Sequence, residues 1–426
     1  MHYVIIGNSV AAAGAIEGIR QVDQEGSITI FSDEPHHIYS RPLISYFLAD
    51  KVGAQQMKYR PDNYYEANKV TARLGEKVIG VNGSKKVVVL EDGQELSYDK
   101  LLVATGGKPI KPPIKGLDKG NVHTFLQWDE VKAIKEKVAP GKKVVVLGAG
   151  LIGLKAAEGL KGAGCEVTVI DLADRVLSAI LDHQAGELVQ QHLQKQQIKF
   201  YLNNTVEQVL GDNKVAGVRL KDGTELACDL LIVAIGVIPS TEILKINPEG
   251  SRVKINRGII VNQQMATSVE DIYAAGDVAE GLELLSASNR VLPILPNAYR
   301  QGEVAGINMA GGQKDFGGGI AMNAIGFFGL QMVTAGYPIP LEGEGWEVIA
   351  NVDLDLKTIK KVMLKQNRVM GFIFLNMVDK AGIYSWLLEN QIDVTPFKEH
   401  LLKEEFGFAY LPEELRKQRL VEGGRD

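Results

Sequence analysis

One stretch decides the fold: Val145-Val146-Leu147-Gly148-Ala149-Gly150-Leu151-Ile152-Gly153. Its apolar start predicts a buried strand, and the G-x-G-x-x-G turn that follows predicts the beginning of a helix. The next predicted strand ends in Asp171. Glycines in such a turn let backbone N–H groups approach a pyrophosphate at a helix N-terminus, and the acid accepts hydrogen bonds from ribose hydroxyls. The stretch therefore predicts a dinucleotide site, with NAD(H) preferred because a carboxylate repels a 2′-phosphate.

The same pattern occurs earlier in the chain. Val4-Ile5-Ile6-Gly7-Asn8-Ser9-Val10-Ala11-Ala12 matches it in register, with small residues at two of the three glycine positions. Each block is followed by an Asp-Gly pair, which predicts a hairpin turn, and then by an apolar run that predicts a strand buried in a parallel sheet. These runs are Leu101–Gly106 and Leu230–Gly236. The chain is thus expected to contain two related α/β units.

Three further segments resemble motifs of the two-domain pyridine-nucleotide flavoprotein reductases. Thr267–Val278 resembles their second FAD fingerprint, Leu102–Gly107 their ATG segment, and Pro296–Gly306 the helix whose N-terminus points at the flavin. The resemblance implies an α/β fold with two Rossmann-like domains, one for FAD and one for NAD(H), plus a C-terminal α+β domain. The expected FAD-binding domain covers 1–110 and 241–318, the NAD-binding domain 111–240, and the C-terminal interface domain 319–426.

The cysteine content selects a branch of that family. Cys165 and Cys228 are the two cysteines of the chain, and neither lies in the first half of the expected FAD domain, where the disulfide and peroxide reductases need a thiol. The segment Ser32–Leu43 resembles the thiol-free branch, which includes rubredoxin reductases, ferredoxin reductases of oxygenase systems and the flavin module of assimilatory nitrite reductase. Chemistry through a protein thiol is therefore not expected.

The glycine turns and the resemblance together predict the cofactor-binding positions. In the FAD domain they are Gly7, Asn8, Ser9, Ala12, Asp33, Arg41, Val78, Ala104, Thr105, Gly106, Gly276, Asp277, Leu295 and Asn297. In the NAD domain they are Gly148, Gly150, Leu151, Ile152, Gly153, Asp171 and Gly236. Two of these positions have a plain structural alternative, since Asp33 could be a turn acid and Arg41 a solvated surface residue. No spacing of the seven histidines predicts a metal site.

Two positions depart from the family in a way that bears on catalysis. Many relatives have a lysine where Tyr46 stands and a glutamate where Lys155 stands, and that pair lies beside the flavin and the nicotinamide. Tyr46 and Lys155 are therefore the catalytic candidates, with Lys155 positioning the hydride transfer. The alternative is that Lys155 only extends from its helix into solvent.

Composition limits the partners. The net charge of −5 gives no basic footprint for nucleic acid, and the apolar run Leu230–Ile238 is too short for a membrane helix. A predicted strand begins at Tyr3, so a signal peptide is not expected, and a cytoplasmic location is. The segment Asn323–Gly329 is expected to place Phe327 and Phe328 at a docking face beside the flavin, or else in the core.

The function that these features favour is an FAD-dependent NAD(H):acceptor oxidoreductase. Two cysteines cannot ligate an iron–sulfur cluster, so the single-electron partner is expected to be a separate iron–sulfur carrier or subunit, such as a rubredoxin, a ferredoxin or a partner dehydrogenase subunit. One alternative is an NADH oxidase that produces peroxide. Another, from a different class, is a flavin-binding or redox-sensing subunit without turnover. The oligomeric state, including a homo-oligomer, is left open.

Overall fold

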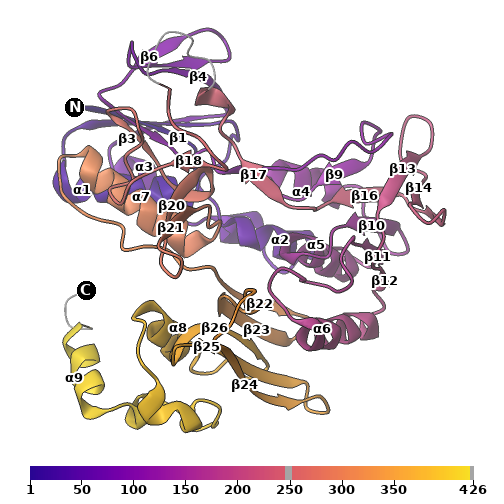
Figure 1. Ribbon diagram of the computed structural model, residues 1–426. Helices are drawn as coiled ribbons and strands as arrows, with labels where there is room; N and C mark the ends of the chain where they lie inside the picture. Colours follow the sequence, from indigo (N-terminus) through magenta and orange to yellow (C-terminus); the bar gives the residue numbers. More distant parts are fainter. Residues whose placement is uncertain (245–251, 423–426) are drawn as a thin grey trace.

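Two five-stranded parallel sheets and one five-stranded antiparallel sheet organise the computed structural model, which describes residues 1–244 and 252–422 (Figure 1). The first parallel sheet has the order β19-β7-β1-β2-β3. Its strands are β1 (His2–Ile6), β2 (Ser27–Ser32), β3 (Val70–Leu74), β7 (Lys100–Val103) and β19 (Ile272–Ala274). Because β19 follows the second unit in sequence, this sheet is assembled from two separate stretches of the chain.

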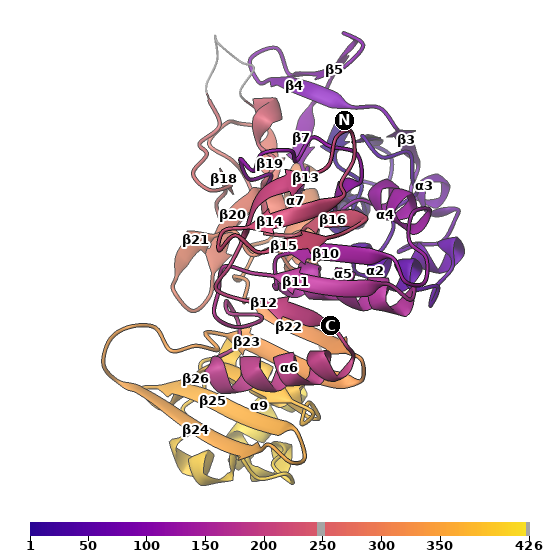
Figure 2. The same cartoon turned by 90° about the vertical axis from the view of Figure 1, so that its right-hand side faces the viewer.

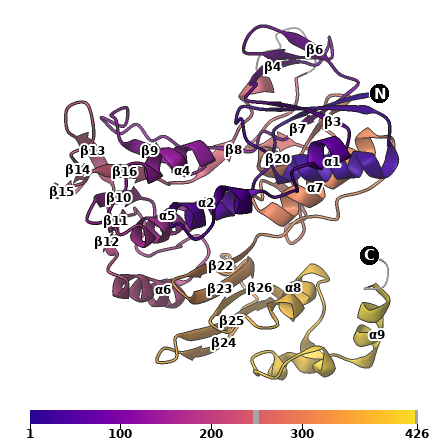
Figure 3. The same cartoon turned by 180° about the vertical axis from the view of Figure 1, so that it is seen from behind.

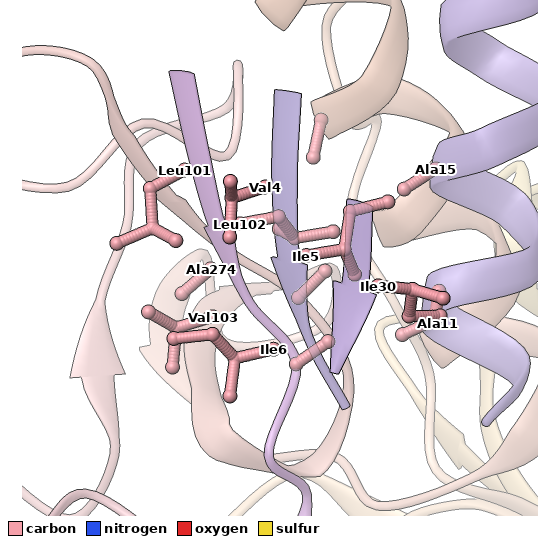
Figure 4. Close-up of a cluster of buried hydrophobic side chains, with 14 of the residues drawn as sticks. Val4, Ile5, Ile6, Ala11, Ala15, Ile30, Leu101, Leu102, Val103 and Ala274 are labelled. Atoms are coloured by element: carbon pink, nitrogen blue, oxygen red, sulfur yellow. The ribbon is translucent and has the colours of Figure 1, made fainter. Parts of the chain in front are cut away.

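The core of the first sheet explains its apolar strands. Figure 4 shows the side chains of β1, β2 and β7 packed together, with Ala11 and Ala15 of helix α1 (Val10–Val22) against them. Val4, Ile5, Leu101 and Leu102 are completely buried. Continuous apolar runs are what a parallel sheet covered on both faces requires, since no strand face is left to solvent.

Helix α1 packs unusually closely against helix α7 (Leu295–Met309), and Figure 3 shows the two side by side. A Cβ at Gly14 would lie 2.3 Å from the carbonyl oxygen of Tyr299, and one at Gly302 would lie 2.0 Å from that of Ala11. The glycines therefore allow backbone-to-backbone contact, which brings the N-terminal ends of both helices to the same edge of the sheet.

The second parallel sheet repeats this arrangement with the order β12-β11-β10-β16-β9. Its strands are β9 (Val122–Thr124), β10 (Lys143–Leu147), β11 (Glu166–Ile170), β12 (Lys199–Tyr201) and β16 (Leu230–Val233), and its helices are α4 (Trp128–Lys135), α5 (Leu151–Gly162) and α6 (His183–Lys195). The two connections between the units run side by side, as β8 (Gly107–Pro109) pairs antiparallel with β17 (Val237–Pro239).

Small antiparallel sheets accompany each unit. Strands β4 (Val78–Asn82), β5 (Val87–Leu90) and β6 (Glu95–Ser97) form one, and β13 (Val206–Leu210), β14 (Gly217–Leu220) and β15 (Glu225–Ala227) form its counterpart. The turns at Gly93 and Gly223 confirm the two Asp-Gly hairpins predicted from sequence, and both glycines have positive φ. A third sheet contains β18 (Ile259–Ile260), β20 (Ala279–Glu283) and β21 (Ser288–Arg290), and short helices α2 (Ile44–Leu48) and α3 (Tyr64–Ala67) complete the first unit.

The C-terminal region is built on the antiparallel sheet β22-β23-β26-β25-β24. Its elements are β22 (Met322–Phe327), β23 (Leu330–Gly336), β24 (Trp346–Asp353), β25 (Thr358–Lys365), β26 (Arg368–Leu375), α8 (Ala381–Glu389) and α9 (Glu413–Glu422). Figure 2 shows α6 of the second unit lying beside this sheet. Within residues 1–244 and 252–422, none of the helices has the length and apolar character to cross a membrane.

Candidate functional site

A cavity of about 2080 Å³ lies where the three main sheets meet. Both glycine turns line it, and so do residues of α2, of α5 and of strands β22 and β23. All predicted cofactor and catalytic positions except Ala12, Gly153 and Asn297 are among its lining residues. Residues that are far apart in sequence are thus gathered around one space.

The three exceptions have packing contacts instead. Ala12 is completely buried within α1. A Cβ at Gly153 would lie 1.9 Å from the carbonyl oxygen of Gly148, so glycine is needed there for the helix to approach the turn. The side-chain amide of Asn297 donates to the carbonyl oxygen of Ile320 at 3.2 Å, and its side chain is directed away from the cavity into the contact with the C-terminal region.

The two glycine turns have nearly the same geometry. Gly7 has a φ of 116° and Gly148 a φ of 117°. Helices α1 and α5 begin directly after these turns, and neither N-cap residue, Ser9 nor Gly150, makes a side-chain capping bond. The first N–H groups of both helices are therefore left for an anionic group in the cavity, where the helix dipole also favours negative charge.

Asp171 lies beside the second turn. One carboxylate oxygen accepts from the backbone N–H of Ala149 at 2.5 Å, and the other accepts from Ala173 at 2.7 Å. The carboxylate is thereby fixed at the wall of the cavity with acceptor capacity remaining for hydroxyl groups. Its neighbour Leu172 is 68% exposed, so the adjacent position carries no positive charge.

Arg41 belongs to a network that sequence reasoning only partly anticipated. Its guanidinium donates to Glu34 at 2.6 Å and to the carbonyl oxygen of Leu126 at 3.1 Å. Tyr39 joins the same network by donating to Glu34 at 2.8 Å. Glu34 is buried and was not predicted, although it directly follows the predicted Asp33. Arg41 therefore lines the cavity as a held cation rather than as a freely solvated side chain.

Asp277 faces the same part of the cavity. Burial raises the pKa of its carboxyl group, and the positive charge of Arg41 acts against that rise. The N–H of the preceding Gly276 donates to the side chain of Gln301 in α7 at 2.9 Å, which fixes the backbone of this turn. A carboxyl group with a depleted hydration shell gains most from a hydroxyl donor of a bound ligand.

Lys155 does not extend into solvent. Its side chain is 12% exposed and pairs with Glu158 of the same helix, and its ammonium lies 4.5 Å from the ring centroid of Tyr46. Both catalytic candidates are therefore in contact at the cavity wall. Glu158 was missed by sequence reasoning, and the signal that could have found it is its position three residues after Lys155 on one helix face.

The docking role expected for Phe327 is wrong. Its side chain is completely buried and packs against the second unit, with its ring 5.7 Å from the ammonium of Lys155. The core alternative holds for this residue because the tip of the β22–β23 hairpin is inserted against α5 and α6. Phe328, by contrast, is partly exposed.

Thiols and metal ligands are not gathered at the cavity. Cys165 and Cys228 are buried elsewhere, and burial raises the pKa of the Cys228 thiol to about 12. Within the ranges that the structure describes, no group of three or more His, Cys, Asp or Glu side chains could hold a metal ion.

Comparison with known proteins places these features in context. The family model described as pyridine nucleotide-disulphide oxidoreductase matches residues 1–302. The chain is 32% identical to the epsilon subunit of NADH-dependent phenylglyoxylate dehydrogenase from Aromatoleum evansii, over 94% of each chain. It is 31% identical to rubredoxin-NAD(+) reductase from Pseudomonas putida, over 73% of this chain and 80% of that one. It is 33% identical to a nitrite reductase [NAD(P)H] from Bacillus subtilis, over 92% of this chain but only 48% of that longer protein.

Solved structures agree in fold. The covalent putidaredoxin reductase–putidaredoxin complex matches with a TM-score of 0.84 at 23% identity, over 100% of this chain and 99% of that one. A NAD-dependent persulfide reductase from A. fulgidus matches with a TM-score of 0.82 at 27% identity, over 92% of this chain and 78% of that one. The fold predicted from sequence, two Rossmann-like units with a further C-terminal region, is confirmed. The boundaries assigned to the domains stay predictions.

Proposed function

Since the chain belongs to the pyridine nucleotide-disulphide oxidoreductase family, we propose that it exchanges a hydride with NAD(H) and single electrons with a separate iron–sulfur carrier or subunit. As a member of that family it is an FAD-dependent NADH oxidoreductase. The observation that carries the proposal is the single cavity joining two glycine turns with no cysteine in its wall. Chemistry in such a space proceeds between two bound nucleotides rather than through a protein thiol.

The residues present fit both cofactors. A pocket for one drug-sized ligand has a volume of about 300–1,000 Å³, so a cavity of about 2080 Å³ has room for two dinucleotides. The turn at Gly7, together with Arg41 and Asp277, would hold FAD. The turn at Gly148, together with Asp171, would hold NAD(H). When bound, FAD supplies the conversion between two-electron hydride chemistry and single-electron transfer.

The chain itself supplies binding, orientation and charge. The N-termini of α1 and α5 stabilise the two pyrophosphates, and Asp171 accepts from ribose hydroxyls. The antiparallel sheet closes one side of the cavity through strands β22 and β23, which reduces the access of water to the reacting groups. Lys155 provides a fixed positive charge at the wall, beside Tyr46.

The proposed partner is an iron–sulfur protein. This chain has two cysteines, and both are buried away from the cavity, so it does not supply the four thiolates of a cluster. The names of the relatives support a separate acceptor, because one is a rubredoxin reductase and another is a subunit of a larger dehydrogenase. In a dehydrogenase complex, electrons would flow toward NAD⁺. The two free cysteines also support a cytoplasmic location, where thiols stay reduced.

A second candidate is an NADH oxidase. A protein of that name from Methanocaldococcus jannaschii is 33% identical over 74% of this chain. The two candidates differ in what reoxidises the flavin, either molecular oxygen or a protein carrier.

An anaerobic titration with NADH followed by turnover assays distinguishes the candidates. We expect fast bleaching of the flavin absorbance, slow turnover in air, and a rise of orders of magnitude when the correct iron–sulfur carrier is added. Turnover in air as fast as bleaching would establish the oxidase instead. Failure of NADH to bleach the flavin, and of the partner to reduce it in the presence of NAD⁺, would support a subunit without turnover.

A further inference from the structure

We propose that Glu158 is a positioning residue, which fixes the ammonium group of Lys155 at the reacting end of the cavity and is itself held by the C-terminal hairpin. The inference rests on the proposed function, because it concerns the charge beside the bound flavin. No position of the family pattern quoted above assigns a role to Glu158.

The reacting end of the cavity can be located from its lining. The two glycine turns bind the two pyrophosphates, so the reacting rings must meet where both units contribute side chains to the same wall. Tyr46 of α2 comes from the first unit, and Ile152 and Lys155 of α5 come from the second. Residues 322–326 of the C-terminal region line the cavity as well. Lys155 therefore stands at the junction of all three parts.

The ammonium of Lys155 is enclosed on several sides. It pairs with Glu158, donates to the carbonyl oxygen of Gly326 at 3.3 Å, and lies over the ring of Tyr46 at 4.5 Å. The side chains of Lys155 and Glu158 are only 12% and 9% exposed. Charges in such surroundings interact more strongly than on an exposed surface, and an unpaired one is costly. The pair is thus a fixed pair of charges rather than a surface ion pair.

Glu158 is held from the opposite side by a turn of the backbone. Its second carboxylate oxygen accepts from the N–H of Phe328 at 3.0 Å. Phe328 and Gly329 form the two-residue connection between β22 and β23, with φ values of 47° and 88°. Positive φ at both positions is typical of a type I′ hairpin turn, but it is uncommon for a phenylalanine. The N–H that this turn leaves unpaired within the hairpin is the one that Glu158 accepts.

The same hairpin tip is fixed to a second helix. The ring nitrogen Nε2 of His192 in α6 donates to the carbonyl oxygen of Phe327 at 3.0 Å. The tip therefore spans α5 and α6, and its position determines where the Glu158 carboxylate lies. We infer that the C-terminal sheet contributes to the flavin site through Glu158 and not through an aromatic side chain.

The proposal makes an electrostatic statement that can be measured. The pair is neutral as a whole, so removing Lys155 leaves a net negative charge and removing Glu158 leaves a net positive charge. Reduction of the flavin adds negative charge to the cavity, which a cation stabilises and an anion opposes. The midpoint potential of the flavin should therefore fall in Lys155→Met, rise in Glu158→Gln and return close to the original value in the double variant.

The experiment measures that potential by equilibration with a reference dye, without any carrier. We expect each single variant to shift the reduction equilibrium about tenfold in opposite directions, which is about 30 mV for a two-electron couple. Lys51→Met is the matched control, because Lys51 lies 4.0 Å from the same carboxylate but is 52% exposed. It should leave the potential unchanged. The thermal unfolding midpoint and the FAD content of each variant are recorded alongside.

The role of the hairpin is tested by a turn variant. Gly329→Ala strains a backbone with positive φ in open space, and Gly345→Ala does the same in another turn of the C-terminal region. The shift caused by Glu158→Gln should shrink at least by half in the Gly329→Ala background and persist in the Gly345→Ala background. Persistence in both would show that the turn does not hold Glu158.

Other outcomes count against the proposal as a whole. Lower unfolding midpoints with unchanged potentials would mean that the pair only stabilises the fold. Shifts of the same sign in both single variants would also contradict it. A protein that does not retain FAD would instead refute the proposed function, and this would be evident before any potential is measured.

Discussion

Gly7 lies so close to the carbonyl oxygen of Ala104 that a Cβ on it would be 2.1 Å from that oxygen. In the second unit, a Cβ on Gly148 would be 2.3 Å from the carbonyl oxygen of Ala234. Both glycines also have a φ near 116°, which side chains rarely adopt. The two dinucleotide turns thus depend on the same backbone contact.

This equivalence predicts that alanine at the two positions impairs different cofactors. We expect Gly7→Ala to reduce the FAD content of the purified protein, and Gly148→Ala to raise the KM for NADH at least tenfold while FAD is retained. Flavin absorbance per chain and steady-state kinetics measure the two effects. Loss of FAD in both variants would mean that the turns are not independent binding sites.

Asp277 is expected to contribute to FAD retention through a buried, charge-assisted hydrogen bond. Asp277→Ala should weaken FAD binding by roughly 1.5–3 kcal/mol, about tenfold or more in the dissociation constant. Asp277→Asn keeps an acceptor oxygen and should lose less. Fluorescence of FAD released on dilution measures both, and equal binding in all three proteins would remove Asp277 from the site.

Asp171 is expected to select NADH over NADPH, because its carboxylate would lie next to a 2′-phosphate. Asp171→Ala combined with Leu172→Arg should shift the ratio of kcat/KM values toward NADPH, since residue 172 is exposed and can supply a positive charge. Leu172→Arg alone is the control and should change the preference less. Equal kcat/KM for the two cofactors in the unmodified protein contradicts the assignment.

Lys360 is expected to make stability depend on pH. It is buried in the C-terminal sheet, with its ammonium 5.0 Å from the ring centroid of Tyr384, and burial lowers its pKa to about 8. The unfolded chain holds this proton up to about pH 10.4, so the free energy of unfolding should rise as the pH increases from about 8 to 10. The gain from this group is at most roughly 3 kcal/mol.

Lys360→Met isolates that contribution, because a thioether fills similar space without a charge. The variant should be more stable than the original protein near pH 7, and the difference should vanish as the pH approaches 10. Urea unfolding at several pH values measures it. A difference that does not vary with pH would show that the charge of Lys360 is not the cause.

The sequence by itself determined the features that depend on neighbouring residues. A strand, a glycine turn, a helix and a terminal acid form one continuous segment, so both dinucleotide units and Asp171 could be predicted from local pattern alone. The Asp-Gly hairpins at Gly93 and Gly223 followed for the same reason, because turn chemistry is local.

Only the tertiary structure decided which distant side chains meet. Asn297 was predicted at the flavin, yet its amide bonds to Ile320, because the start of α7 packs against the chain entering the C-terminal sheet. Phe327 belongs to the core and Glu158 to the cavity wall for a related reason. The hairpin of the C-terminal sheet is inserted against α5, and no local pattern encodes the register of two surfaces so far apart in the chain.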